Sequence, residues 1–493
     1  MIEFIIAGII GLGTLLWLWF WSKARPHNFP PGPVALPLFN NLLSVSMDER
    51  LSLELEHLHK KYGSMVSLAI AGNNIWDVWI NDFDIVKEVL NDPRFNSRNV
   101  FGFFELFEVQ NGLAFASGES WKAKRKVIHQ IFRSMGVGRN SFGQKVEAEV
   151  EKFVKHLDKL EKKELDIRKY AGYLSNNVIF SLLFNKTFNY EDPKYLELYY
   201  YINQLFELQN PSGLHWVVPL WVAKHMSVSK KLLSLRKKFS DNLLSEFMAR
   251  KPSSADAARN REPECLADHL WDKMLVDNDP IVTEKTVVGI LVDIVLAGQE
   301  TTTNSLSWLF LAMIHYPAVQ EMVFNELSSK TDLSLPVVPY SVQNECDYTV
   351  ATIWEAMRVY PVLYSTLDHT ASEDIDNLHG FRIPKGTRLF GNMVCIFKDK
   401  KYWKVPESFN LENFLNEDGK YNKQPYMAPF GLGARACIGE NVARMEVFTA
   451  FASIMRKFKI EAVGIEKPSL VPVVGFVGIA PSPFKVNLTN RTS

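Results

Sequence analysis

Cysteine is scarce in this sequence, with only four residues in a chain of 493: Cys265, Cys346, Cys395 and Cys437. They are widely spaced and form no Cys-x-x-Cys pair, so neither a zinc site nor a disulfide framework is expected. This sparing use of cysteine favours a reducing compartment for the folded domain.

The sequence also lacks a net charge, because 55 basic residues are balanced by 55 acidic ones. A nucleic-acid binder is expected to carry a basic excess, so we expect no nucleic-acid partner. No repeat, low-complexity tract or convincing linker divides the chain. With 47% hydrophobic residues, it predicts one large domain, in which residues 251–264 and 328–344 are long surface loops.

A motif near the C-terminus combines loop-forming glycines with a cysteine. Residues 430–439 read Phe-Gly-Leu-Gly-Ala-Arg-Ala-Cys-Ile-Gly, and helical apolar spacing begins at Ile438. Cys437 therefore precedes a helix N-terminus, a position that favours a thiolate over a thiol. Arg435 is a permanent cation suited to an anionic group on a ligand. The alternative is a buried structural thiol.

A long helix forms the second notable element. The spacing predicts one helix from Thr283 to His315, about 45 Å long at 1.5 Å per residue. Its middle contains Gly298 and a run of threonines starting at Thr301, which are poor helix formers. Such a local exception in a strong helix indicates a functional site; the alternative is a glycine at a close helix crossing.

The pattern Phe-x-x-Gly-x-Arg-x-Cys-x-Gly resembles the haem-binding loop of the cytochrome P450 family. The resemblance implies a cytochrome P450 fold, mainly α with a small β region (α+β), and haem b with Cys437 as the axial thiolate and metal ligand. Thiolate ligation favours O–O cleavage. Residues 297–302 resemble the family's oxygen-binding groove, which implies that Gly298 leaves room for dioxygen and that Glu300 and Thr301 relay protons.

Further residues match positions that contact the haem in this family. Trp121 and Arg125 share one face of a predicted helix at residues 120–132, and the resemblance implies that they bind the haem propionates together with His369 and Arg435. Arg98 is a weaker match, and an exposed loop histidine is the alternative for His369. The predicted cofactor-binding set is Cys437, Arg435, Trp121, Arg125, His369, Arg98, Phe430, Gly431, Gly439, Ala297 and Gly298.

A possible ion pair lies in the predicted helix at residues 348–360. Glu355 and Arg358 are three residues apart in an apolar helix, where they resemble the family's buried pair that braces the haem-binding loop. Asn413 stands where the family's motif usually has an arginine. Because an asparagine carbonyl accepts hydrogen bonds, we expect Asn413 to accept one from Arg358.

The N-terminus predicts a membrane anchor. Residues 4–21 contain no charged residue, close to the minimum length of a membrane span, and Lys23 and Arg25 follow, which places the rest in the cytoplasm. A cleaved signal peptide is the alternative, although the basic n-region and the cleavage site are missing. The Pro-rich residues 29–33 match a hinge of microsomal family members.

We therefore predict an anchor at 1–25, a hinge at 26–34 and a catalytic domain at 35–493, held on the endoplasmic reticulum membrane by a single span. Three Asn-x-Ser/Thr sequons, at Asn185, Asn487 and Asn490, should then remain unmodified.

The implied activity is that of a monooxygenase that inserts one atom of O2 into a hydrophobic small molecule, such as a fatty acid, sterol or xenobiotic. Electrons would come from NADPH through a flavoprotein reductase, with a small electron-transfer haem protein as a further candidate partner. The phenylalanines of residues 100–115 form either a substrate lid or core packing. The alternatives are a peroxide-rearranging relative and a haem-binding sensor.

Overall fold

The computed structural model describes residues 8–14, 25–35, 41, 45–46, 48, 50–69, 76–100, 102–160, 163–208, 218, 220–475 and 478–491. The predicted membrane span at 4–21 lies mostly outside this part; its described residues, 8–14, are helical. Among the described residues, no helix has the length and apolar character needed to cross a membrane.

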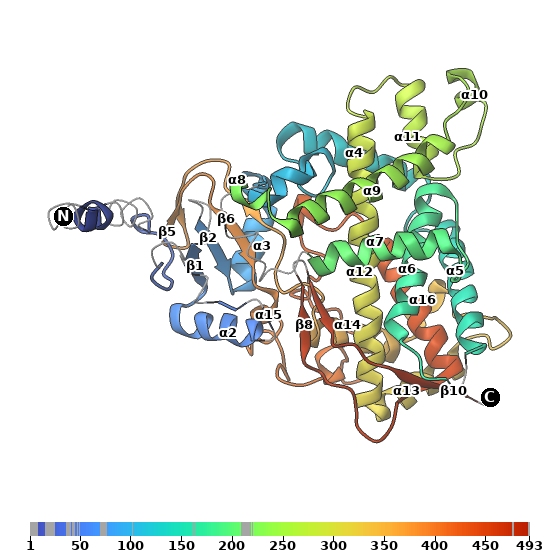
Figure 1. Cartoon of the computed structure of the whole chain (residues 1–493). Coiled ribbons are helices and arrows are strands. Elements are labelled where there is room, and N and C mark those ends of the chain that lie inside the picture. Colours follow the sequence, from blue (N-terminus) through green and yellow to red (C-terminus); the bar gives the residue numbers. More distant parts are fainter. Residues whose placement is uncertain are drawn as a thin grey trace.

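Helices make up most of the fold (Figure 1), as the sequence predicts. The α-helices are α2 (Leu51–Tyr62), α3 (Phe83–Asn91), α4 (Gly118–Ser134), α5 (Asn140–Asp158), α6 (Ile167–Phe184), α7 (Pro193–Leu208), α8 (Leu220–Ala223), α9 (Ser227–Ala249), α10 (Ala255–Arg259), α11 (Leu266–Leu275), α12 (Glu284–His315), α13 (Pro317–Lys330), α14 (Asp347–Val359), α15 (Met393–Ile396) and α16 (Glu440–Lys457). Short 3-10 turns are η1 (Pro93–Phe95), η2 (Gly102–Phe107), η3 (Val109–Asn111), η5 (Tyr340–Glu345), η6 (Leu411–Asn413) and η7 (Gly433–Arg435).

Helix α12 runs through the middle of the molecule and packs against α6, α9, α14 and α16 (Figure 1). The Thr283 side chain caps its start by accepting the Thr286 N–H. Apolar residues cover it almost all round from Leu306 to Ile314, as expected for a helix buried in a large core. The predicted helix at 283–315 is confirmed.

The β region lies to one side of the helices, near the N-terminal end in Figure 1. Its four-stranded sheet has the order β1-β2-β6-β3, with β1 (Met65–Ala69), β2 (Trp76–Ile80), β6 (Arg388–Gly391) and β3 (His369–Thr370). The sequence predicts a strand pair at residues 65–70 and 75–80, and strands β1 and β2 pair there in antiparallel fashion. The described residues also form three two-stranded sheets: β4 (Ile375–Leu378) with β5 (Phe381–Ile383), β7 (Phe458–Ala462) with β10 (Val486–Asn490), and β8 (Pro472–Val474) with β9 (Ile479–Pro481). Of these, β10 lies beside the C-terminus, away from the four-stranded sheet (Figure 1).

The Pro-rich segment is held against strand β1. Ser67 donates its N–H to the Pro31 carbonyl and its hydroxyl to the Pro30 carbonyl, each at 2.7 Å. A Cβ on Gly32 would lie 2.0 Å from the Ser67 carbonyl oxygen, so a larger residue would force the segment away from the sheet. The segment predicted as a hinge is therefore fixed to the domain at this end.

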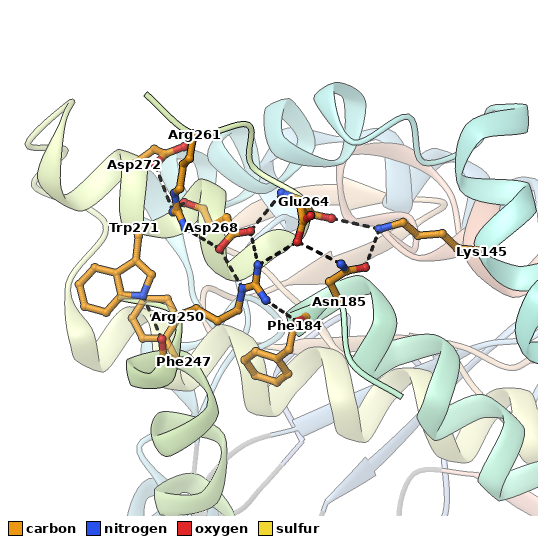
Figure 2. A network of polar contacts seen from close by, with 10 residues as sticks. All are labelled: Lys145, Phe184, Asn185, Phe247, Arg250, Arg261, Glu264, Asp268, Trp271 and Asp272. Carbon is orange, nitrogen blue, oxygen red and sulfur yellow. Dashed lines mark hydrogen bonds and ion pairs between the residues drawn. The ribbon is translucent and has the colours of Figure 1, made fainter. Parts of the chain in front are cut away.

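The segments predicted as long surface loops are partly helical. Residues 251–264 contain α10, while α13 and η5 occupy both ends of residues 328–344. A polar network orders the first of these segments, as Figure 2 shows. At its centre the Asp268 carboxylate, with a side chain 1% exposed, accepts hydrogen bonds from Arg250 and Arg261 and from the Glu264 N–H.

The same network reaches the C-terminal end of α6. Asn185 donates to Glu264 and accepts from Lys145, each at 3.1 Å (Figure 2). Burial raises the pKa of Asp268, but the hydrogen bonds from Arg250 and the Glu264 N–H outweigh it and lower this pKa to about 2. The charged carboxylate thus stabilises the folded state.

We predict that Asp268→Asn lowers the free energy of unfolding by about 1–3 kcal/mol at neutral pH, since it removes the charge that two arginines face. A pKa below the usual value means that this contribution is complete above about pH 4 and shrinks as the pH falls towards 2. Urea unfolding across pH measures it. Asp256→Asn, in an exposed pair with Arg259, is the control; equal effects would contradict the prediction.

Candidate functional site

The loop before α16 presents Cys437. The Cys437 N–H donates to the Phe430 carbonyl at 2.8 Å, which closes the loop on itself. Gly433 has φ +68°, and a Cβ there would lie 1.9 Å from the Leu90 carbonyl oxygen of α3. Only glycine allows both the left-handed backbone and this close approach. The contact therefore fixes the position of the loop relative to α3.

Cys437 is exposed, yet the surrounding protein raises the pKa of its thiol, chiefly through desolvation. Hydrogen bonds from the backbone of Gly439 and Glu440 act in the opposite direction but do not outweigh it. The start of the helix thus favours the thiolate, as predicted, but burial disfavours it more strongly among the protein groups. A metal ion on the sulfur would remove the proton outright.

Three arginines, Arg98, Arg125 and Arg435, gather beside this loop; we call them the cation cluster. The Arg435 guanidinium lies 3.8 Å from the centre of the Trp121 ring and donates to the carbonyls of Asn96 and Ala116. Burial lowers the pKa of Arg435 to about 9, and the charges of Arg98 and Arg125 contribute. The cluster thus holds more positive charge than its protein neighbours neutralise.

Arg98, a member of the cluster, and His369, another predicted propionate-binding residue, lie where Ser97 bridges to strand β3. Arg98 is buried, and its Nη1 donates to the Asp368 carbonyl at 3.0 Å. His369, in β3, is 4% exposed and contacts the Phe95 carbonyl through Nδ1 at 3.0 Å. Burial, followed by the charge of Arg98, lowers the pKa of His369 to about 3. The alternative of an exposed loop histidine is therefore wrong.

Two buried donors at this site have no hydrogen-bond partner among the described residues: Trp121 Nε1 and Arg98 Nε. An unsatisfied buried donor costs about 1–3 kcal/mol, and excess buried positive charge adds to that cost. A ligand with carboxylate groups would relieve both. The site accordingly fits a group that combines a metal ion for Cys437 with anionic arms for the arginines.

Comparison with known proteins decides the family. The family profile described as Cytochrome P450 matches residues 30–488. Cytochrome P450 2F5 of Gorilla gorilla gorilla is 30% identical, with 95% of this chain and 96% of the relative covered. Cytochrome P450 2J1 of Oryctolagus cuniculus is 29% identical, with 92% of this chain and 90% of the relative covered. The chain belongs to the cytochrome P450 family.

As a cytochrome P450, the protein is a haem-thiolate monooxygenase, an oxidoreductase that uses haem b with a cysteine ligand. The residues around Cys437 fit this cofactor, because two propionate arms would satisfy the open donors of Trp121 and Arg98. Among the four cysteines, Cys437 alone is exposed, while Cys265, Cys346 and Cys395 are buried.

The middle of α12 divides the predicted cytochrome P450 groove residues between two faces. Ala297 is exposed, and the Thr301 hydroxyl, one turn later, donates to its carbonyl at 2.7 Å. Gly298 faces α6 instead, where a Cβ would lie 2.5 Å from Ile179 Cδ1. This contact favours the alternative of a close helix crossing, while the role of Gly298 as space for dioxygen stays a prediction.

Glu300 is likewise directed towards α6. Its Oε1 lies 2.6 Å from Arg168 Nη2 and accepts from Asn304 Nδ2 at 3.1 Å. The described hydrogen bonds therefore place Glu300 and Thr301 in separate contacts rather than in one pair. Sequence reasoning missed Arg168, since it lies in another helix and belongs to no motif.

The Glu355–Arg358 pair of this cytochrome P450 is fully buried, with both side chains 0% exposed. Arg358 donates to the carbonyls of Phe397, Pro406 and Ser408. Asn413 does not accept from Arg358 as predicted; its Nδ2 donates to Glu355 Oε1 at 3.1 Å instead. The side-chain oxygen of Asn413 accepts the Val405 N–H instead.

Asn413 also connects the brace to the cysteine loop. Its backbone carbonyl accepts from Gln424 Nε2 at 2.9 Å, and the Gln424 carbonyl accepts the Met427 N–H at 3.2 Å. Met427 lies three residues before Phe430, so the pair is linked to the loop by consecutive hydrogen bonds.

We predict that Asn413→Ala lowers the free energy of unfolding by about 1–3 kcal/mol, because the Val405 N–H loses its acceptor, and the Val405 carbonyl and Glu355 each lose a donor. Urea unfolding measures this. Asn422→Ala, at an exposed position of the same segment, should change stability by less than about 0.5 kcal/mol. Equal losses in both variants would contradict a bracing role for Asn413.

Proposed function

We propose that this cytochrome P450 inserts oxygen into an apolar small molecule, such as a fatty acid, sterol or xenobiotic, with Cys437 as the axial ligand of its haem. The convergence of an exposed cysteine, three arginines and an unpaired Trp121 N–H carries the proposal. When bound, the haem supplies the activation of dioxygen.

Five side chains would hold the propionates. Trp121 and Arg98 offer unpaired N–H groups, and Arg125 and Arg435 bring the charge. His369 is neutral in the protein alone, because burial and the neighbouring arginines lower its pKa; a nearby carboxylate would raise that pKa again. Phe430, Gly431 and Gly439 would shape the backbone that faces the sulfur side.

Thr301 and Glu300 would provide protons from the α12 side of the site. The Thr301 hydroxyl donates its hydrogen bond to the Ala297 carbonyl. The Thr301 oxygen can therefore accept a hydrogen bond from a water molecule and orient that water. Glu300 is half-buried, and its Arg168 partner is 30% exposed, which gives the carboxylate access to solvent protons. Movement of Glu300 away from Arg168 would complete the relay.

We predict that Thr301→Ala reduces the product formed per NADPH consumed by roughly a hundredfold, at the lower end of acid–base effects, while peroxide release rises. Thr303→Ala is the matched control, because its hydroxyl makes the same bond to a carbonyl four residues earlier, at 2.6 Å, but in the buried core. Similar uncoupling in both variants would contradict a specific role for Thr301.

The substrate would enter beneath aromatic residues of the 100–115 segment. Phe104 and Phe115 stack with ring centres 5.5 Å apart, while Phe107 is buried. Phe101 lies outside the described residues. Phe104 and Phe115 are half-buried and pack against the core, and such partly covered rings would give the entrance an apolar wall.

Electrons would come from NADPH through a flavoprotein reductase, with a small haem protein as a second donor, on the cytoplasmic side of the endoplasmic reticulum membrane. The uncharged run at 4–21 and the following Lys23 and Arg25 support a single anchor. Formation of product with a reductase and NADPH would distinguish this function from a haem sensor.

The absorption spectrum of the reduced, carbon-monoxide-bound protein tests the ligand. We predict a strongly red-shifted Soret band in the parent that Cys437→Ser abolishes and the buried-cysteine variant Cys346→Ala retains. A protein that binds haem without that band would show that Cys437 is not the ligand. A protein that binds no haem would refute the proposed function.

A further inference from the structure

The cation cluster has a buried carboxylate beside it that no motif of the sequence indicates. Asp368, directly before His369, is 6% exposed, and its Oδ1 lies 3.7 Å from Arg98 Nη1. The pKa of Arg98, lowered first by burial, is raised most strongly among the charges by Asp368. The charge of Asp368 also raises the pKa of Arg435 against the effects of burial and Arg98.

The Asp368 carboxylate is held in place rather than free to turn away. Its Oδ2 accepts the Asn99 N–H at 3.0 Å and the Thr370 hydroxyl at 3.3 Å. The Asp368 backbone carbonyl accepts from Arg98, whose own N–H donates to Ser117 Oγ at 2.8 Å. Asp368 therefore holds the Arg98 guanidinium and the adjacent Asn99 N–H, while Ser117 holds the Arg98 N–H.

Asp368 would balance the charge of the cation cluster in the haem-bound protein. Haem b carries two propionates, whereas the cluster carries three permanent guanidinium charges. One positive charge would therefore remain in a buried site, where it is costly. Asp368 supplies the third negative charge and is too buried for solvent to screen it well.

We propose that Asp368 is a positioning residue that orients Arg98 towards a propionate and lowers the reduction potential of the haem iron by its fixed negative charge. This inference rests on the proposed propionate contacts of the cation cluster. A nearby anion stabilises the ferric state, which carries one more positive charge than the ferrous state. Burial of that anion strengthens the effect, since the field acts through protein rather than water.

Redox titration of the haem-bound protein, followed by its visible spectrum, tests the proposal. Asp368→Asn keeps an oxygen for the Asn99 N–H but removes the charge, and we expect the reduction potential to rise. Asp368→Glu keeps the charge and should remain closer to the parent than Asp368→Asn. Asp368→Ser provides the same measurement if the asparagine variant does not fold.

Asp374→Asn is the matched control. Asp374 also pairs with an arginine, Arg382, and accepts a backbone N–H, from Lys385 at 2.7 Å, but its side chain is 49% exposed. Its loss should leave the potential unchanged. An unchanged or lower potential in Asp368→Asn, or an equal rise in Asp368→Glu, would overturn the proposal.

These outcomes are separable from failure of the proposed function. A parent that binds no haem, or lacks the red-shifted carbon-monoxide band, would refute the proposed function. A parent with that band whose potential does not respond to Asp368→Asn would refute the role of Asp368 alone.

Discussion

Buried positive charge is the constraint on which this structure depends. Arg98, Arg125 and Arg435 come from three separate segments, and burial lowers the pKa of each. Guanidinium groups do not lose their protons in practice, so the protein must surround them with acceptors. Backbone carbonyls and Asp368 provide part of that compensation. The propionates of the cofactor would provide the rest, which links cofactor binding to the stability of the fold.

The loop that carries Cys437 is shaped by backbone contacts more than by its own side chains. Gly433 allows the approach to the Leu90 carbonyl, and the Phe430 carbonyl fixes the Cys437 N–H. On the other side, the Glu355–Arg358 pair reaches the loop through Asn413 and Gln424. Backbone contacts and the buried ion pair thus hold the cysteine at a defined position.

Helix α12 packs against α6 with one face and presents the proposed catalytic residue Thr301 on another. Gly298 lets Ile179 of α6 approach closely, whereas Ala297 and Thr301 lie one turn apart on the accessible side. Glu300 is also directed towards α6, where it pairs with Arg168. A motif of consecutive residues therefore does not act as one unit, because successive positions on a helix point in directions about 100° apart.

The sequence by itself determined the family resemblance, the central helix, the strand pair and the order of the motifs, because these depend on local periodicity and on the spacing of neighbouring residues. It also brought together Trp121, Arg125, His369 and Arg435 through that resemblance. Only the tertiary structure decided that Asn413 donates to Glu355, that Gly298 faces α6, and that Asp268 orders a segment expected to be a loop. Each of these contacts forms between segments that are far apart in the sequence. A local sequence pattern does not specify which distant groups will pack together.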